Sequence, residues 1–273
     1  NDKFVVITNH ANIFAYSSDG ITWTQGTMPS SQYWYDICYA DSKFVVVSPS
    51  NVFAYSTDGI NWTQGTMPSN DVYTSICYGN GMFVATCGSD TITSNVFAYS
   101  SDGITWTQGT MPNNRAWISV CYGNGKFVAV CSWNSNISAY SSDGITWTES
   151  TLPSETYWSK VCYGDGMFIA ISRLNDFAYS TDGITWFNSP TSLGHMWADI
   201  CYGNGKFVAV RNNDKAVGYI SKSKSWITNT LPEITANASN RCWTALCYGN
   251  GKFIALVYGT DKYIYSTDGI NWT

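Results

Sequence analysis

The sequence predicts an all-β protein, a seven-bladed β-propeller of four-stranded antiparallel blades, and three observations lead to this prediction. An Ala-Tyr-Ser motif or a close variant recurs at steps of 39 to 46 residues, which gives seven units in one domain of residues 1–273. Each unit holds four short runs of β-branched and aromatic residues separated by turn residues. No stretch has a helical period. Four-stranded repeats of about forty residues are typical of propellers, whereas a β-helix normally has shorter rungs.

The fourth unit shows the expected order of elements. We expect strands over 117–122, 126–130, 137–142 and 145–148, and these are called the first to the fourth strand of a blade. Asn-Gly or Asp-Gly joins the first two strands in five units, and Asp-Gly joins the last two in six. These residues tolerate the positive φ that a two-residue hairpin requires. We expect the aspartates of the second turn to be structural and to bind backbone N–H groups: Asp19, Asp58, Asp102, Asp143, Asp182 and Asp268.

The first blade is expected to differ from the others. The opening Asn-Asp-Lys-Phe-Val-Val matches Gly-Asn-Gly-Lys-Phe-Val-Ala-Val only from the first turn onward. The chain therefore has seven sets of second, third and fourth strands but six first strands. We expect the first blade to lack its inner strand within this chain. Either the remainder of a longer parent protein supplies this strand or the blade stays three-stranded. An edge strand with unpaired backbone groups tends to pair with other chains, which favours a supplied strand.

The second turn lies within a longer motif, Tyr-Ser-Ser-Asp-Gly-Ile-Thr-Trp at 99–106. This motif resembles the Asp-box, also called the bacterial neuraminidase repeat, of β-propeller proteins, and it recurs along the whole chain. The resemblance implies a hairpin between the third and fourth strands of a blade, although the motif here is one residue shorter than the usual one. The tryptophan is expected to pack blade on blade. More weakly, the arrays resemble repeats of phage tail-fibre and bacterial surface proteins.

The nine cysteines are expected to be free. Six occupy one repeated position, at Cys38, Cys77, Cys121, Cys162, Cys201 and Cys247, which favours a small buried apolar filler over a disulfide framework. Cys87 and Cys131 are equivalent in neighbouring units, so a disulfide between them is the alternative. Many free thiols indicate folding in a reducing compartment, even if the protein works outside it.

Composition excludes several partners and cofactors. The net charge of −5 and the absence of a basic stripe argue against nucleic acid. No Lys/Arg cluster draws the chain to anionic lipid, and no apolar run approaches the roughly 20 residues of a spanning helix, so no membrane insertion is expected. The cysteines lie singly in separate units, and the two histidines lie far apart, so neither a metal site nor another cofactor is expected.

Binding residues are expected where the repeats differ. Both hairpin turns have constant length, and in an antiparallel blade they share one rim. The segments between the second and third strands and between blades share the other rim, and all the variation in length falls there. These variable loops also hold the rarer residue types: Arg115, Arg173, Arg211, Arg241, His10, His195 and Trp133. Binding residues commonly lie on loops of a rigid scaffold, although loops also drift when nothing constrains them.

A second candidate set begins the first strands. An aromatic residue lies four positions before each repeated cysteine, at Trp34, Tyr73, Trp117, Trp158, Trp197 and Trp243. First strands are innermost in a propeller, so these rings would lie near the mouth of the central funnel, where they would suit sugar rings. The alternative is that they only fill the space between blades.

Catalysis is not expected. A sialidase-like hydrolase, which shares the scaffold that the Asp-box resemblance implies, needs an arginine cluster, a Tyr/Glu pair and an acid/base aspartate. The chain has three glutamates, and none lies in the core of a repeat. We therefore expect a non-enzymatic, lectin-like or receptor-binding module for a glycan or another cell-surface ligand, located outside the cell or on a cell or virion surface. The alternative function is a protein–protein interaction scaffold, which buried first-strand aromatics would favour.

Overall fold

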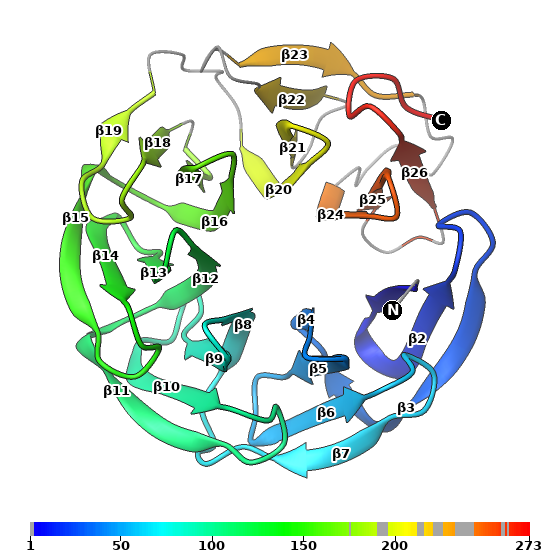
Figure 1. Ribbon diagram of the computed structural model, residues 1–273, viewed down its shortest axis with the longest axis horizontal. Coiled ribbons are helices and arrows are strands. Elements are labelled where there is room, and N and C mark those ends of the chain that lie inside the picture. The colour runs from blue at the N-terminus through cyan, green and yellow to red at the C-terminus, as the bar shows by residue number, and fades with distance from the viewer. Residues whose placement is uncertain are drawn as a thin grey trace. The chain divides into compact units, whose positions relative to one another are not determined.

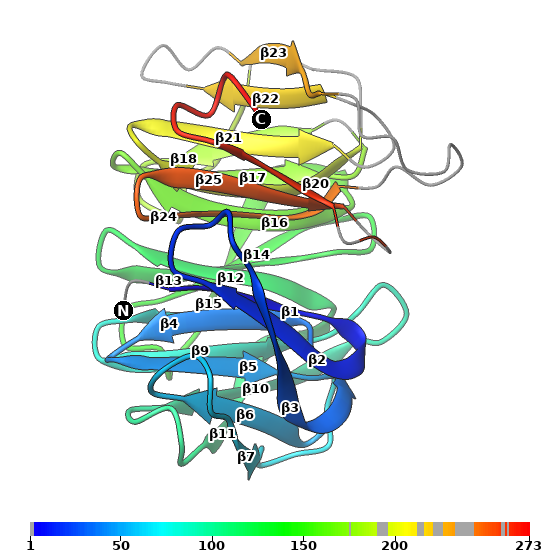
Figure 2. The ribbon, with the colours of Figure 1, turned by 90° about the vertical axis from the view of Figure 1, so that its right-hand side faces the viewer.

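The chain folds into seven antiparallel β-sheets (Figures 1 and 2), the blades of a β-propeller. The computed structural model describes residues 3–174, 176–189, 196–211, 216–220, 226–232, 243–257, 260 and 262–273. The chain divides into two compact units, one of residues 1–133 and 137–151 and one of residues 134–136 and 152–273. The predicted all-β fold is confirmed, and so is the three-stranded first blade.

The strands follow chain order within every blade. The first blade holds β1 (Phe4–Ile7), β2 (Asn9–Ser17) and β3 (Thr24–Tyr33). The second holds β4 (Asp36–Ala40), β5 (Lys43–Val47), β6 (Val52–Ser56) and β7 (Thr63–Thr66). The third holds β8 (Tyr73–Gly79), β9 (Met82–Cys87), β10 (Ser94–Ser100) and β11 (Thr107–Arg115). The fourth holds β12 (Trp117–Gly123), β13 (Lys126–Cys131), β14 (Ser135–Ser141) and β15 (Thr148–Thr156).

The remaining blades follow the same order. The fifth holds β16 (Trp158–Gly164), β17 (Met167–Ser172), β18 (Phe177–Ser180) and β19 (Phe187–Asn188). The sixth holds β20 (Trp197–Gly203), β21 (Lys206–Arg211), β22 (Ala216–Ile220) and β23 (Ile227–Thr230). The seventh holds β24 (Trp243–Gly249), β25 (Lys252–Val257) and β26 (Tyr263–Ser266), beside which Thr273 exchanges two backbone hydrogen bonds of 2.9 Å with Tyr265.

The turns between the first and second strands have the predicted geometry. Asn124 and Gly125, for example, have φ of 44° and 74°, as a primed two-residue turn requires. The second blade lacks the Asn-Gly pair, yet Asp41 and Ser42 adopt the same conformation with φ of 46° and 59°. An aspartate tolerates this conformation better than most residues, which explains why the hairpin persists there.

The fourth strands begin later than predicted. We expected a strand over 145–148, but β15 starts at Thr148. The reason is the box aspartate: Oδ1 of Asp143 accepts the backbone N–H groups of Ile145 and Thr146, both at 2.8 Å. These donors are consumed in the turn and cannot join the sheet ladder.

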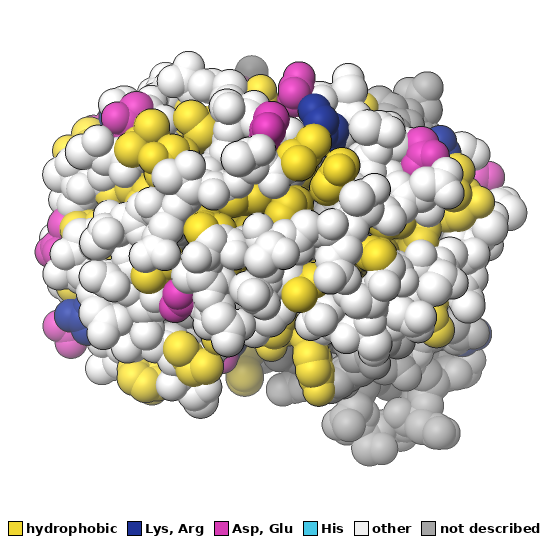
Figure 3. Space-filling view, turned by 90° about the horizontal axis from the view of Figure 1, so that it is seen from below, with side chains coloured by type: hydrophobic (Ala, Val, Ile, Leu, Met, Phe, Trp, Pro, Cys, Tyr) yellow, Lys and Arg dark blue, Asp and Glu magenta, His cyan; other side chains and the backbone are white. Residues whose placement is uncertain are grey.

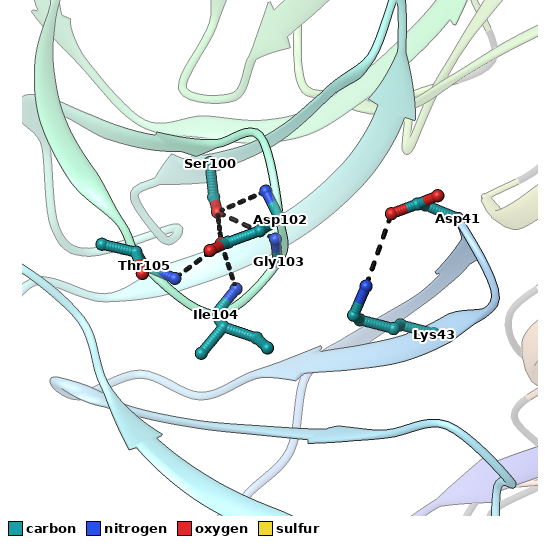
Figure 4. A network of polar contacts seen from close by, with 7 residues as sticks. All are labelled: Asp41, Lys43, Ser100, Asp102, Gly103, Ile104 and Thr105. Carbon is teal, nitrogen blue, oxygen red and sulfur yellow. Dashed lines mark hydrogen bonds and ion pairs between the residues drawn. The ribbon is translucent and has the colours of Figure 1, made fainter.

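Figure 4 shows this network in the third blade, where one carboxylate organises the whole turn. Oδ1 of Asp102 accepts from the N–H groups of Ile104 and Thr105 at 2.8 and 2.7 Å, and from the Ser100 hydroxyl at 2.8 Å. The same hydroxyl oxygen accepts the N–H of Gly103 at 2.9 Å. The structural role predicted for the box aspartates is thus an aspartate-bonded turn. The figure also shows the exposed ion pair of Lys43 and Asp41, 3.4 Å apart.

The box tryptophans pack between neighbouring blades. The ring centroid of Trp106 lies 5.8 Å from that of Phe53 in the preceding blade and 6.5 Å from that of Phe83 in its own blade. Trp147 repeats the arrangement with Phe97 and Phe127 at 5.8 and 6.4 Å. Tilted and edge-on contacts at these distances are favourable for aromatic rings. The tryptophan therefore joins the core of two adjacent sheets.

The described cysteines are all free, so no disulfide joins Cys87 and Cys131, which are both buried. The six repeated cysteines lie at the border of the core: five are half-buried and Cys247 is exposed. The expectation of fully buried fillers is thus met only in part. Desolvation raises the pKa of the Cys38 and Cys162 thiols to about 12, which makes them poor nucleophiles at neutral pH.

Replacement of Asp102 by alanine should destabilise the protein, because three donors lose a charged acceptor. We expect the free energy of unfolding to fall by about 1–3 kcal/mol. Asp102→Asn keeps an acceptor oxygen in place, so its free energy of unfolding should fall by less. Urea titration measures both changes. An alanine variant within about 0.5 kcal/mol of the parent would contradict the structural role.

Acid should weaken the fold through these turns. Burial acts to raise the pKa of Asp102, but the N–H groups of Thr105 and Ile104 and the Ser100 hydroxyl outweigh it and lower the pKa from 3.8 to about 2. Because the folded-state pKa lies below the unfolded value, this stabilisation is present above pH 3.8 and is lost as the pH falls toward about 2. The urea midpoint should fall in that window, and less steeply in Asp102→Asn. A urea midpoint that stays constant over that pH range would refute the stabilising role of the aspartate turns.

Candidate functional site

Within single blades, a recurring backbone hydrogen bond joins the two kinds of variable loop. In the third blade the N–H of Gly88 donates to the carbonyl of Val72 at 2.9 Å. In the fourth blade the N–H of Ser132 donates to the carbonyl of Ala116 at 3.0 Å. In the fifth blade the N–H of Arg173 donates to the carbonyl of Tyr157 at 2.9 Å. Each bond joins the residue after a second strand to the residue before the first strand of the same blade. The two kinds of variable loop therefore form one surface in each of these blades.

The first-strand aromatics are buried and do not offer their faces to a ligand. All six are 4% exposed or less: Trp34, Tyr73, Trp117, Trp158, Trp197 and Trp243. Trp117, for example, packs with Met111 and Phe127 in the core, and its indole N–H donates to the carbonyl of Asn113 at 3.0 Å. The rings fill space inside the fold. This is the outcome that favours the protein-interaction scaffold.

The predicted arginines have different surroundings. Arg115 is exposed at the end of β11, where it pairs with Ser94. Arg173 is half-buried after β17. Arg211 is buried, and its guanidinium carbon lies 4.9 Å from the centroid of the Trp197 ring, a cation–π contact inside the fold. Arg241 and His195 lie outside the described residues, and nothing is stated of the side chain of His10.

Trp133 is the predicted residue whose surroundings most resemble a binding site. Its side chain is 45% exposed, and its indole N–H donates to the carbonyl of Asp90 in the preceding blade. The neighbouring Ser132 hydroxyl donates to Oδ1 of Asp90 at 3.0 Å. The Asp90 loop is closed by backbone bonds between Ser89 and Ile92 of 2.8 and 3.2 Å. We call Asp90, Ile92, Arg115, Ser132 and Trp133 the Trp133 platform.

The platform combines apolar surface with polar groups. Ile92 is 45% exposed beside the anchored Asp90. Arg115 is adjacent to Ala116, which bonds to Ser132, so the end of β11 reaches the same place. The sequence signals were the longest second-to-third-strand spacing, in the third unit, and the one tryptophan outside the repeat pattern. Asp90 and Ile92 were missed because nothing in their local sequence marks them.

The backbone of Trp133 is strained. Its φ is 76°, and that of Asn134 is 45°. A bulky residue other than glycine seldom adopts positive φ, and residues held in such conformations gather at functional sites. The hydrogen bonds from Ser132 and Trp133 to Asp90 hold the loop in this conformation. The strain is therefore a second, independent indication of function at this position.

Other variable loops also expose large apolar side chains. They are Tyr33, Tyr35, Tyr157, Leu174 and Met196. The constant turns expose mainly one repeated isoleucine, at Ile21, Ile60, Ile104 and Ile145. Charged side chains are sparse on the face in Figure 3, where polar and backbone atoms dominate and apolar side chains form scattered patches. The variable loops thus differ from one another in chemistry as well as in length.

The described residues contain no group of three or more His, Cys, Asp or Glu that could hold a metal ion. In that part of the chain no helix has both the length and the apolar character needed to cross a membrane.

Comparisons with known proteins show the fold. No family model matches the chain, so the Asp-box resemblance rests on the motif alone, and no curated protein matches its sequence. Virginiamycin B lyase from Staphylococcus aureus is similar in structure, with a TM-score of 0.72 and 19% identity over 88% of this chain and 83% of that one. A streptogramin B lyase gives a TM-score of 0.75 and 14% identity, covering 88% and 81%. YCF48 bound to D1 peptide gives 0.68 and 12%, covering 100% and 85%.

The expectation that the protein is not an enzyme needs correction. The two lyases are enzymes by name and share this fold. At 14–19% identity the likeness shows the fold alone, but it removes the ground on which catalysis was excluded. The error came from comparing the sequence with one kind of catalytic propeller.

The strain at Trp133 predicts an unusual order of stabilities. Both Trp133→Gly and Trp133→Ala remove the indole contacts, but only glycine adopts positive φ without strain. Trp133→Gly should therefore be more stable than Trp133→Ala by about 1 kcal/mol. Thermal and urea unfolding of the two variants measure the difference. An alanine variant as stable as the glycine variant would contradict the left-handed conformation.

Proposed function

We propose that this chain is a protein-recognition module that binds a polypeptide partner through its variable loops, with the Trp133 platform as the main contact. The observation that carries the proposal is an exposed tryptophan held in a strained conformation by hydrogen bonds to a neighbouring blade. Holding a large ring at the surface costs free energy, and binding a partner would recover part of it by burying the ring.

The composition of the platform suits a protein interface. Tryptophan, tyrosine and arginine are the residues that most often dominate the binding energy of interfaces. Trp133 supplies an apolar ring, Ile92 adds apolar area, and Arg115 is an exposed guanidinium at the end of β11. YCF48, which has the same fold, is bound to a peptide in its solved structure. That scaffold is thus able to present a polypeptide-binding surface, which supports the proposal by analogy.

A glycan is the second candidate ligand, and one observation favours it. The exposed Trp133 ring lies beside the polar groups of Asp90 and Ser132, and aromatic faces with nearby polar groups suit sugar rings. A glycan or receptor on a cell surface, and a location outside the cell or on a virion, remain part of this second proposal. The six buried first-strand rings add no surface to it.

A paired screen separates the two ligand classes. The chain is presented to a displayed peptide library and to a glycan array, and the binders are titrated against variants. Peptide binders should lose affinity about 30-fold or more in Trp133→Ala, as expected for a hot-spot tryptophan. The matched control is Ile145→Ala, which removes a similarly exposed apolar side chain from a constant turn and should leave affinity unchanged.

The possible outcomes discriminate clearly. Peptide binding that depends on Trp133 but not on Ile145 supports the proposal. Binding of glycans alone, with the same dependence on Trp133, would replace it with the second candidate. Peptide binding equal in both variants would move the site away from the platform.

A further inference from the structure

The aromatic ring of the Trp133 platform is held by one edge. The indole N–H of Trp133 donates to the backbone carbonyl of Asp90, so the nitrogen edge of the ring is turned toward the preceding blade. The side chain is nevertheless 45% exposed. The exposed surface therefore belongs mainly to the faces and the far edge of the ring. The face of an indole has a negative electrostatic potential, and among aromatic side chains it attracts cations best.

An exposed carboxylate lies beside this ring. Asp90 is exposed, and its Oδ1 accepts the Ser132 hydroxyl at 3.0 Å. Ser132 directly precedes Trp133 in the chain, so this hydrogen bond holds the carboxylate next to the residue that carries the ring. A carboxylate offers about four acceptor positions, so one such group can bond to a hydroxyl and to a guanidinium together. The platform thus combines the two groups that attract a planar cation.

The balance of charge around the platform also favours a cation. Arg115 pairs in the sheet with Ser94, whose hydroxyl donates to Oδ1 of Asp71 at 2.9 Å. Asp71 therefore brings a second carboxylate to the same end of the sheet as Arg115. Asp71 and Asp90 together outnumber that one guanidinium, and the whole chain has a net charge of −5. Complementary charge steers association, so a positive group on the partner is favoured.

An arginine side chain would satisfy the ring and the carboxylate together. Its guanidinium is planar, so it stacks on an aromatic face while its N–H groups bond to a carboxylate. A lysine ammonium ion has no plane to stack and is more strongly hydrated. This chain contains an example of such stacking, since the guanidinium carbon of Arg211 lies 4.9 Å from the centroid of the Trp197 ring.

We propose that the Trp133 platform recognises an arginine side chain of its polypeptide partner, whose guanidinium stacks on Trp133 and pairs with the carboxylate of Asp90. This inference rests on the proposed function and names the residue type at the centre of the contact. Ile92, which is 45% exposed, supplies apolar area for the methylene stem of the arginine. The stacking and the exposed ion pair together should contribute about tenfold to affinity.

The test uses peptides that bind the intact chain. A displayed library of random peptides is selected on the chain, and the tightest peptide that loses binding in Trp133→Ala is synthesised with a fluorescent label. Each arginine of this peptide is then replaced in turn by citrulline, which has nearly the same shape as arginine but no charge. Fluorescence anisotropy should identify one arginine whose replacement weakens binding about tenfold.

A matched pair of variants locates that arginine on the platform. Asp90→Asn removes the charge but keeps a side-chain oxygen for Ser132 and the backbone carbonyl that anchors Trp133. In this variant the citrulline replacement should weaken binding only about threefold, because the stacking contact alone remains. The control is Asp41→Asn, which neutralises an exposed aspartate of a constant turn. There the replacement should still weaken binding about tenfold.

The outcomes separate this inference from the proposed function. A citrulline loss that shrinks in Asp90→Asn but not in Asp41→Asn would support it. Peptides that depend on Trp133 but contain no arginine, or that tolerate citrulline at every arginine, would overturn it and leave the proposed function in place. A citrulline loss of the same size in Asp90→Asn and in the parent would also overturn it. A selection that yields no peptide dependent on Trp133 would overturn both proposals.

Discussion

The hydrogen-bonded turn of the box aspartate is the constraint on which the rest of the structure depends. By accepting two backbone N–H groups, Asp102 withholds them from the sheet, and the fourth strand begins only at Thr107. Trp106 therefore stays outside the ladder, and its ring is free to pack between two blades. One carboxylate thus sets the start of the outer strand and the contact that joins neighbouring sheets. Repetition of the motif repeats both effects along the chain.

This constraint also separates the two rims in their freedom to change. The hairpin turns carry the hydrogen bonds that fix each blade, so their lengths stay constant. The opposite loops are held by backbone bonds such as that of Ser132 to Ala116, and they differ from blade to blade in length and in side chains. The loop between β9 and β10, the longest that joins a second to a third strand, holds Asp90 and supports Trp133. The turns that stabilise the blades and the loops that we propose for recognition therefore lie on different parts of the same blades.

Local patterns sufficed to predict the strands, the turns and the missing inner strand, because each depends on residues close together in the sequence. The burial of Trp117 was not decided by its own strand, since the covering residues come from other strands. The onset of β15 was missed because the side chain of Asp143 competes with the ladder, which strand propensity ignores. Trp133 was selected by its rarity, but its partner Asp90 lies 43 residues away and carries no local signal.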